Sequence, residues 1–162
     1  MCGIIGYCGP KSSVEVLLEG IKRLEYRGYD SAGMAVIGKN GLAIRRSLGK
    51  LRELEKVLNQ EPLSGTVGIG HTRWATHGRP SEANAHPHQV GDLAVVHNGI
   101  IENYLDIKED LLKEGHRFAS ETDTEIVSHL VVRHLSRGAD YLTAIQHTLQ
   151  EIKGSYALVL VN

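Results

Sequence analysis

Apolar residues recur along the chain with two different spacings. Short, nearly continuous apolar runs predict strands at 3–8, 32–38, 42–47, 66–72, 93–97 and 155–162. Apolar residues three or four positions apart predict helices within 12–28, 50–60, 104–115, 122–138 and 140–152. Lys39-Asn40-Gly41 joins the second and third strands as the turn of a hairpin. Strands and helices therefore mix along one chain, as in an α+β or α/β protein.

Local signals mark where two of these helices begin. Ser12 is followed three residues later by Glu15, and Thr122 by Glu125, the spacing of a capping box. Between the strands at 66–72 and 93–97 lies a polar loop of about twenty residues, which is long for a compact domain and favours a functional role.

Composition narrows the classes of partner. A chain of 162 residues with net charge −1 is long enough for one domain with a core and has no basic stripe for nucleic acid or an anionic membrane. No apolar stretch approaches the ~20 residues of a membrane span, and the N-terminus lacks the pattern of a secretory signal. We therefore expect a cytoplasmic protein with a small-molecule partner, and neither nucleic acid nor membrane as a partner.

The two cysteines lie close to the N-terminus. Cys2 and Cys8 on one extended strand would sit ~20 Å apart, too far for a disulfide, so two free thiols are expected. If Met1 is removed, Cys2 holds a thiol with a pKa of ~8.5 beside a free α-amine with a pKa of ~7.7–8.0. One residue then supplies a nucleophile and a base, although a small apolar residue at the start of a strand would explain Cys2 equally well.

Five motifs in a fixed order decide between these interpretations. They are MCGIIG at the N-terminus, RLEYRGYDSAG at 23–33, HTRWATHGRPSEANAHPH at 71–88, HNGIIENY at 97–104 and SETDTE at 120–125. Together they resemble the glutaminase domain of the glutamine–fructose-6-phosphate aminotransferase family. The resemblance implies an α+β N-terminal-nucleophile hydrolase fold, an αββα four-layer sandwich of antiparallel sheets, that hydrolyses L-glutamine to glutamate and ammonia without a cofactor.

The resemblance also implies the rest of the family's architecture. In it, residues 1–162 form an incomplete type 2 glutamine amidotransferase domain, truncated at the C-terminal end. A sugar-phosphate isomerase domain follows in the full-length enzyme and is absent here, and the full-length form is a possible homodimer. The matching N-terminal cysteine, Cys2, is the nucleophile of this family.

The same resemblance assigns roles to the central site residues. Asn98, through its side-chain amide, and Gly99, through its backbone N–H, hold the oxyanion, while Arg73 binds the substrate carboxylate and Asp123 its ammonium group. Each residue also has a local explanation: an ion pair for Arg73, a hairpin turn for Asn98-Gly99 and a helix cap for Asp123.

Other residues carry secondary roles by the same resemblance. The loop over bound glutamine contributes Trp74, Thr76 and His77. Near the nucleophile the family has an arginine that corresponds to Arg27, for which a charge at a helix C-terminus is the local alternative. His86 and His97 are expected to support the loop and Asn98 by hydrogen bonds.

Three alternatives remain open. The first is a zinc hydrolase, in which three of the five histidines between 71 and 97 bind the metal; the spacing is loose, and the resemblance favours a site with no metal. The second is the glutaminase domain of another class II amidotransferase. The third is a regulatory or binding domain without catalysis.

Overall fold

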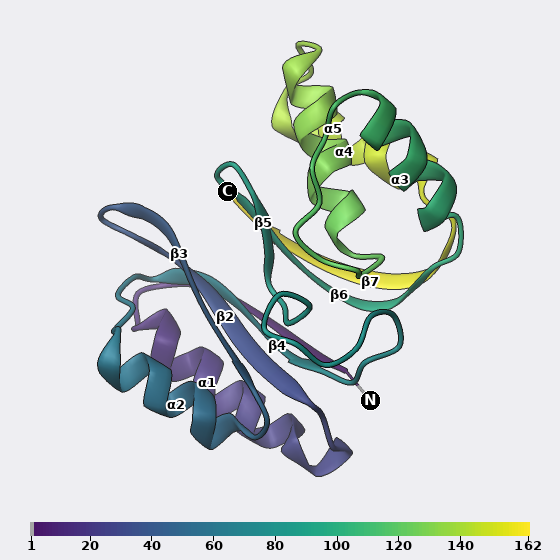
Figure 1. Ribbon diagram of the computed structural model, residues 1–162. Helices are drawn as coiled ribbons and strands as arrows, with labels where there is room; N and C mark the ends of the chain where they lie inside the picture. The colour runs from purple at the N-terminus through teal and green to yellow at the C-terminus, as the bar shows by residue number, and fades with distance from the viewer. Residues whose placement is uncertain (1) are drawn as a thin grey trace.

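The computed structural model describes residues 2–162, except for the side chain of Arg27, and arranges them in four layers (Figure 1). Met1, on whose removal the free α-amine of Cys2 depends, lies outside the described residues. The helices are α1 (Ser13–Leu24), followed by the 3₁₀ turn η1 (Glu25–Arg27), α2 (Leu51–Gln60), α3 (Tyr104–Lys113), α4 (Glu125–Ser136) and α5 (Tyr141–Glu151). The strands are β1 (Gly3–Cys8), β2 (Ser31–Gly38), β3 (Gly41–Leu48), β4 (Val67–Arg73), β5 (His88–Val90), β6 (Leu93–Ile101) and β7 (Gly154–Val161).

Two antiparallel sheets form the middle of the molecule. The first has the strand order β1-β4-β2-β3 and the second has the order β5-β6-β7. Helices α1 and α2 cover the outer face of the first sheet, and α3, α4 and α5 cover the second (Figure 1). The predicted αββα sandwich of antiparallel sheets is therefore confirmed.

Alternation of side chains across each strand builds three apolar layers. Between the helices and the first sheet lie Leu17, Ile21, Met34 and Leu54, among others. Between the two sheets lie Ala35, Ile69, Ala94 and Val96. A third cluster, which includes Val95, Ile126 and Leu130, fills the space between the second sheet and its helices. Since successive side chains point to opposite faces, these clusters show which residues of each strand face the other sheet.

Most predicted elements are confirmed, but the structure differs from the local sequence rules at a predicted turn, at two predicted capping boxes and at one short strand. Asn98-Gly99 is not a hairpin turn, because β6 continues to Ile101 and pairs along its length with β7 from the far end of the chain. Neither predicted capping box forms: Ser12 makes no capping hydrogen bond with its side chain, and α4 begins only after Thr124. The three-residue strand β5 was not predicted.

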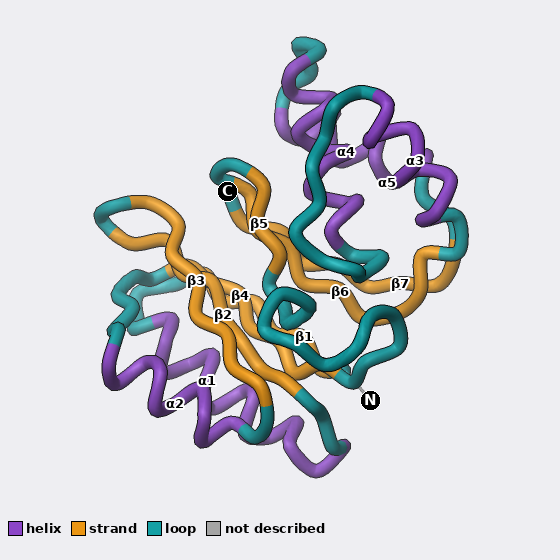
Figure 2. The backbone as a smooth tube through the Cα atoms, in the orientation of Figure 1, coloured by secondary structure: helices purple, strands orange, loops and turns teal. Residues whose placement is uncertain are grey.

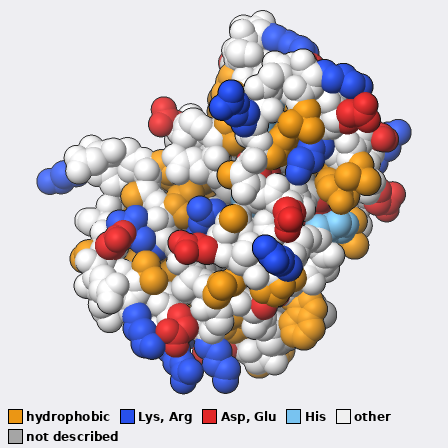
Figure 3. Space-filling model, viewed as in Figure 1, with side chains coloured by type: hydrophobic (Ala, Val, Ile, Leu, Met, Phe, Trp, Pro, Cys, Tyr) orange, Lys and Arg blue, Asp and Glu red, His pale blue; other side chains and the backbone are white. Residues whose placement is uncertain are grey.

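The surface carries charges of both signs. Figure 3 shows acidic and basic side chains intermixed over the face that it displays. Among the described residues, no helix has both the length and the apolar character needed to cross a membrane.

Candidate functional site

Cys2 lies just before β1, at the end of the first sheet where β4 finishes. Because Ile4 belongs to the cluster between the sheets, Cys2, two residues earlier, is placed on the same inner face. The Trp74 backbone N–H donates to the Cys2 sulfur at 3.3 Å, and the thiol lies 3.5 Å from the Trp74 carbonyl oxygen. The thiol is therefore held beside the first residue of the long polar loop. Figure 2 draws loops in teal, among them the one that joins β4 to β5.

Asn98 approaches Cys2 from the second sheet. Its Nδ2 donates to the Cys2 carbonyl oxygen at 3.3 Å, across the interface between the sheets. Val96 faces the first sheet, so the alternation along β6 carries Asn98 to the same face. Strand β6 thus brings an amide donor to the backbone of the cysteine.

Gly99 occupies a position that tolerates no side chain. Its φ is +132°, and a Cβ built there would lie 2.1 Å from the Ser155 carbonyl oxygen. A substituted residue would be strained and would also displace β7. Gly99 therefore keeps the backbone close to β7 while remaining exposed to solvent itself.

Arg73 is buried, with 3% of its surface exposed. One guanidinium nitrogen donates to the carbonyl oxygens of His77 and Gly78, the latter at 3.1 Å. The other terminal nitrogen lies 4.0 Å from Asp30 Oδ1 and has no hydrogen-bond partner among the described residues. Burial lowers the pKa of Arg73, and the nearby Asp30, Cys2 and Asp123 oppose that shift. A buried cation with an unused donor is well suited to bind a carboxylate.

Asp123 is buried against β6 rather than capping a helix. Its Oδ2 accepts from the Ile101 N–H at 2.9 Å, and its Oδ1 lies 3.8 Å from His97 Nδ1. The N-cap of α4 is Thr124, whose side chain makes no capping hydrogen bond. The helix-cap interpretation of Asp123 is therefore wrong. Its carboxylate instead binds Ile101, which lies two residues after Gly99 on β6.

The loop after β4 carries the remaining predicted substrate residues. Trp74 is 53% exposed, Thr76 is exposed, and the His77 ring packs edge-on against Tyr104 with ring centres 5.1 Å apart. Trp74 also lies over Gly28, where an added Cβ would come within 3.2 Å of the indole ring. These three residues share one loop at the cysteine end of the sheets.

Asp30 was missed by the sequence analysis although it lies inside a quoted motif. Its Oδ2 accepts from the Ala75 N–H at 2.5 Å, its Oδ1 accepts from Ser31 Oγ at 3.0 Å, and its own N–H donates to the Arg73 carbonyl at 2.7 Å. Asp30 thus fixes the start of the loop. Its partner Ala75 is 45 residues away, so no local sequence pattern could predict the contact.

Asn84 anchors the far part of the same loop. Its Oδ1 accepts from the Glu121 N–H at 2.8 Å, and its Nδ2 donates to the Arg79 carbonyl at 2.9 Å and to the Glu121 carboxylate at 3.2 Å. The loop is therefore tied to the segment that carries Asp123. This residue, like Asp30, was not among the predicted site residues.

Four of the five histidines between 71 and 97 are buried, namely His71, His86, His88 and His97, while His77 is half-buried. The His71 ring lies 4.1 Å from that of His86, which lies 4.7 Å from that of His88. Burial lowers the pKa of His71 and of His88 to about 3. Within residues 2–162, no three His, Cys, Asp or Glu side chains are grouped so that they could hold a metal ion, so the histidine-based zinc hydrolase is not supported.

His86 and His97 contact each other beside Asn98. The His97 N–H points to His86 Nδ1 at 3.5 Å, and His97 Nδ1 lies 2.8 Å from Thr124 Oγ1. Both contacts hold β6 immediately before Asn98. The Arg27 side chain lies outside the described part of the structure.

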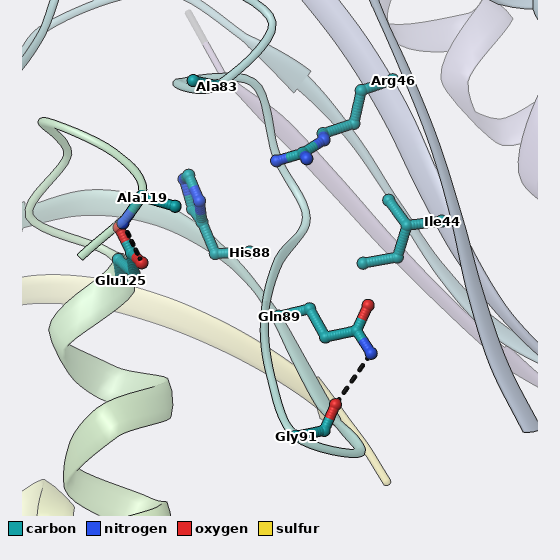
Figure 4. Close-up of a pocket in the computed structure, with 8 residues that line it drawn as sticks. All are labelled: Ile44, Arg46, Ala83, His88, Gln89, Gly91, Ala119 and Glu125. Carbon is teal, nitrogen blue, oxygen red and sulfur yellow. Dashed lines mark hydrogen bonds between the residues drawn. The ribbon is translucent and has the colours of Figure 1, made fainter. Parts of the chain in front are cut away.

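A separate cavity of about 420 Å³ lies between β3 and β5 (Figure 4). Its lining includes Arg46, His88, Gln89 and Glu125. Burial raises the pKa of the Glu125 carboxylate, but His129 and hydrogen bonds from Ala119 and Ser120 outweigh this effect and lower the pKa to about 2. None of the predicted site residues lines this cavity.

The two sheets therefore bring together groups suited to an amino-acid amide. A thiol and an amide donor come from facing strands, and a buried cation and a buried carboxylate lie nearby. The opposite charges of Arg73 and Asp123 match the α-carboxylate and α-ammonium of an amino acid.

Comparison with known proteins agrees with this arrangement. Residues 71–162 match a family described as a glutamine amidotransferase domain. The chain is 51% identical over 161 residues to glutamine–fructose-6-phosphate aminotransferase (isomerizing) of Mesorhizobium japonicum, covering 99% of this chain and 26% of the relative. The enzyme of the same name from Pyrococcus horikoshii is 52% identical over 163 residues, covering 99% and 27%. The chain thus spans about a quarter of the length of these relatives.

Solved structures share the fold. Glutamine phosphoribosylpyrophosphate amidotransferase from B. subtilis superimposes with a TM-score of 0.86 at 26% identity, covering all of this chain and 35% of that one. A structure described as the allosteric regulatory enzyme of purine biosynthesis gives 0.87 at 27% identity, covering 99% and 35%.

Proposed function

The chain belongs to the glutamine amidotransferase domain family, and on this premise we propose that it hydrolyses L-glutamine to glutamate and ammonia with Cys2 as the nucleophile. One observation carries the proposal: Asn98 Nδ2 on the second sheet donates to the Cys2 carbonyl oxygen at the end of the first sheet, at 3.3 Å. A thiol beside an amide donor has the parts needed to attack a carboxamide and to bind the oxyanion that results.

In the first half of the reaction, the Cys2 thiol loses its proton to its own α-amine once Met1 is removed. The thiolate adds to the carboxamide carbon, and the π electrons of the C=O bond move to oxygen. The α-ammonium then gives its proton to the amide nitrogen as the C–N bond breaks. Ammonia leaves, and a thioester remains on Cys2.

The second half returns the enzyme to its starting state. Water adds to the thioester carbon and gives a proton to the α-amine. The C–S bond breaks, and that proton returns to the sulfur. The sum is glutamine plus water giving glutamate plus ammonia, without a cofactor.

Asn98 and Gly99 would donate to the oxyanion in both halves, where loss of one such donor in other enzymes costs about 10²–10³ in rate. Arg73 and Asp123 would hold the α-carboxylate and the α-ammonium. Trp74, Thr76 and His77 would cover the bound substrate, since their loop begins beside the Cys2 sulfur. Arg27 is proposed near the nucleophile on the family resemblance alone.

The acceptor of the ammonia is proposed from the relatives. Identity of 51% to the fructose-6-phosphate enzymes, against 26% to the phosphoribosylpyrophosphate enzyme, favours supply of ammonia for converting fructose 6-phosphate to glucosamine 6-phosphate. An isomerase domain would carry out that step in a longer, cytoplasmic and homodimeric enzyme. The glutaminase step is the part that we assign to residues 1–162.

A glutaminase assay with paired cysteine variants tests the proposal. Cys2→Ala should abolish release of ammonia, whereas Cys8→Ser should keep the wild-type rate because Cys8 is an exposed free thiol at the far end of β1. A metal chelator should leave the wild-type rate unchanged. Glutaminase activity in Cys2→Ala would refute the thiol mechanism. So would a chelator that stops turnover, if added zinc then restores it.

A further inference from the structure

His71 connects the two sheets at the level of the site. It lies on β4, two residues before Arg73, and is fully buried at 0% exposure. Its side chain faces the second sheet, as do those of Ile69 and Arg73 by the alternation along the strand. Its Nε2 donates to the His97 carbonyl oxygen on β6 at 2.8 Å.

This hydrogen bond acts on the peptide group that leads into Asn98. The His97 carbonyl and the Asn98 N–H belong to one planar unit, so a bond to the oxygen restrains the orientation of both residues. On the other side of His97, the backbone N–H points to His86 Nδ1. The His71 and His86 imidazoles therefore bind the two backbone polar groups of His97, His71 its carbonyl oxygen and His86 its N–H.

We propose that His71 is a positioning residue for glutamine hydrolysis, which sets the place of Asn98 on the second sheet relative to Cys2 and Arg73 on the first. The inference rests on the proposed function. Cys2 and Arg73 stand at the end of the sheet that holds His71, and Asn98 directly follows the carbonyl that His71 binds. A local rotation of the peptide group between residues 97 and 98 would misplace the oxyanion donor, whereas Arg73 and Asp123 would keep their own contacts to Gly78 and Ile101.

The chemistry of the side chain suits this role. Burial lowers the pKa of His71 to about 3, so the ring is neutral when the enzyme works. A carbonyl oxygen only accepts, so the single ring proton resides on Nε2, and within residues 2–162 as described Nδ1 has no hydrogen-bond partner. Leucine would fill the same space and leave the buried carbonyl without a donor.

Substitutions at His71 separate positioning from packing. His71→Leu should lower kcat about tenfold to hundredfold, the range expected when a reacting group is misplaced by up to about 1 Å. KM should stay within about twofold, because Arg73 and Asp123 are untouched. His71→Gln places an amide nitrogen near the position of Nε2 and should restore most of kcat.

A buried histidine elsewhere supplies the matched control. His129 on α4 is 4% exposed and contacts His116 at 3.0 Å. His129→Leu should lower the melting temperature while leaving kcat within about twofold of wild type, because it bonds to no residue of the site. A kcat loss in His129→Leu equal to that in His71→Leu would reduce the role of His71 to stability alone.

The outcomes also separate this inference from the proposed function. A folded His71→Leu variant with wild-type kcat would overturn the positioning role and leave glutamine hydrolysis intact. If His71→Leu does not fold, the pair His71→Gln and His71→Asn carries the test, since only the longer amide reaches the carbonyl, and equal kcat in the two would overturn the role. Wild-type protein without glutaminase activity would refute the proposed function, and the positioning role with it.

Discussion

Replacing Arg73 with lysine tests whether the buried guanidinium binds substrate or only holds its loop. In the structure, one nitrogen bonds to the carbonyls of His77 and Gly78, and the other terminal nitrogen has no hydrogen-bond partner in the part of the chain that is described. Lysine keeps the charge but lacks the planar fork that meets a carboxylate with two parallel hydrogen bonds. The substitution therefore changes geometry while keeping net charge the same.

The expected loss follows from the hydrogen bonds removed. A charge-assisted hydrogen bond contributes about 1.5–3 kcal/mol, so loss of one to the α-carboxylate should lower kcat/KM for glutamine about 10- to 150-fold. The α-carboxamide analogue of glutamine has no carboxylate to lose, so its kcat/KM should fall much less. The preference for glutamine over this analogue should shrink by most of the same factor.

Steady-state kinetics with the two substrates gives the result directly. Arg79→Lys is the matched control, because Arg79 lies exposed in the same loop and should show wild-type selectivity. If Arg73→Lys lowers kcat/KM equally for both substrates, the guanidinium only holds the turn at His77 and Gly78. The assignment of Arg73 to substrate binding would then be wrong.

Other consequences follow from particular contacts. Asp123→Asn should keep the bond from β6 but weaken the preference for glutamine over its deamino analogue by about tenfold, which competition kinetics would measure; unchanged preference would contradict the ammonium site. Gly99→Ala should lower both melting temperature and kcat, because its Cβ would lie 2.1 Å from the Ser155 carbonyl oxygen, and calorimetry showing no loss would contradict this strand geometry. Burial lowers the pKa of His71 to about 3 and that of His86 well below 6.5. As pH falls, these two histidines therefore bind protons in the unfolded chain before they do so in the folded protein. The free energy of unfolding should therefore fall as pH drops from about 6.5 toward 3, by up to about 1.4 kcal/mol per pH unit for each, and urea titrations flat across this range would refute it.

The periodic part of the fold was predictable because each strand and helix repeats a short pattern. The alternation in β1, β4 and β6 also determines why Cys2, Arg73 and Asn98 share the space between the sheets. Once the sheets are known to face each other, a period of two places all three side chains.

The failures lie where distant partners override local signals. Asn98-Gly99 has the composition of a tight turn, but β7, some sixty residues later, pairs with it and keeps the chain extended. Thr122 has the spacing of a capping residue, yet its hydroxyl contacts Ser120 and His88 instead. Local rules cannot anticipate such contacts, because they depend on which segments pack together.

Asp30 was missed, and His71 was considered only as a zinc ligand, for a related reason. Each makes its main contact, to Ala75 and to the His97 carbonyl, with backbone rather than with another distinctive side chain. Every residue has a backbone N–H or carbonyl group, so the sequence does not indicate which residue supplies a backbone partner. Histidine content near the loop did suggest chemistry, but the geometry assigns the buried rings to hydrogen bonds and ring contacts.

Mass spectrometry of the protein after reaction with a thiol-reactive glutamine analogue tests the central claim most directly. The account predicts a chain that begins at Cys2 with a free amine, and one adduct that maps to the Cys2 sulfur and abolishes ammonia release. Prior incubation with glutamine should slow the labelling, because substrate and analogue share the site. Labelling at Cys8, or full activity in chains that retain Met1, would contradict the account.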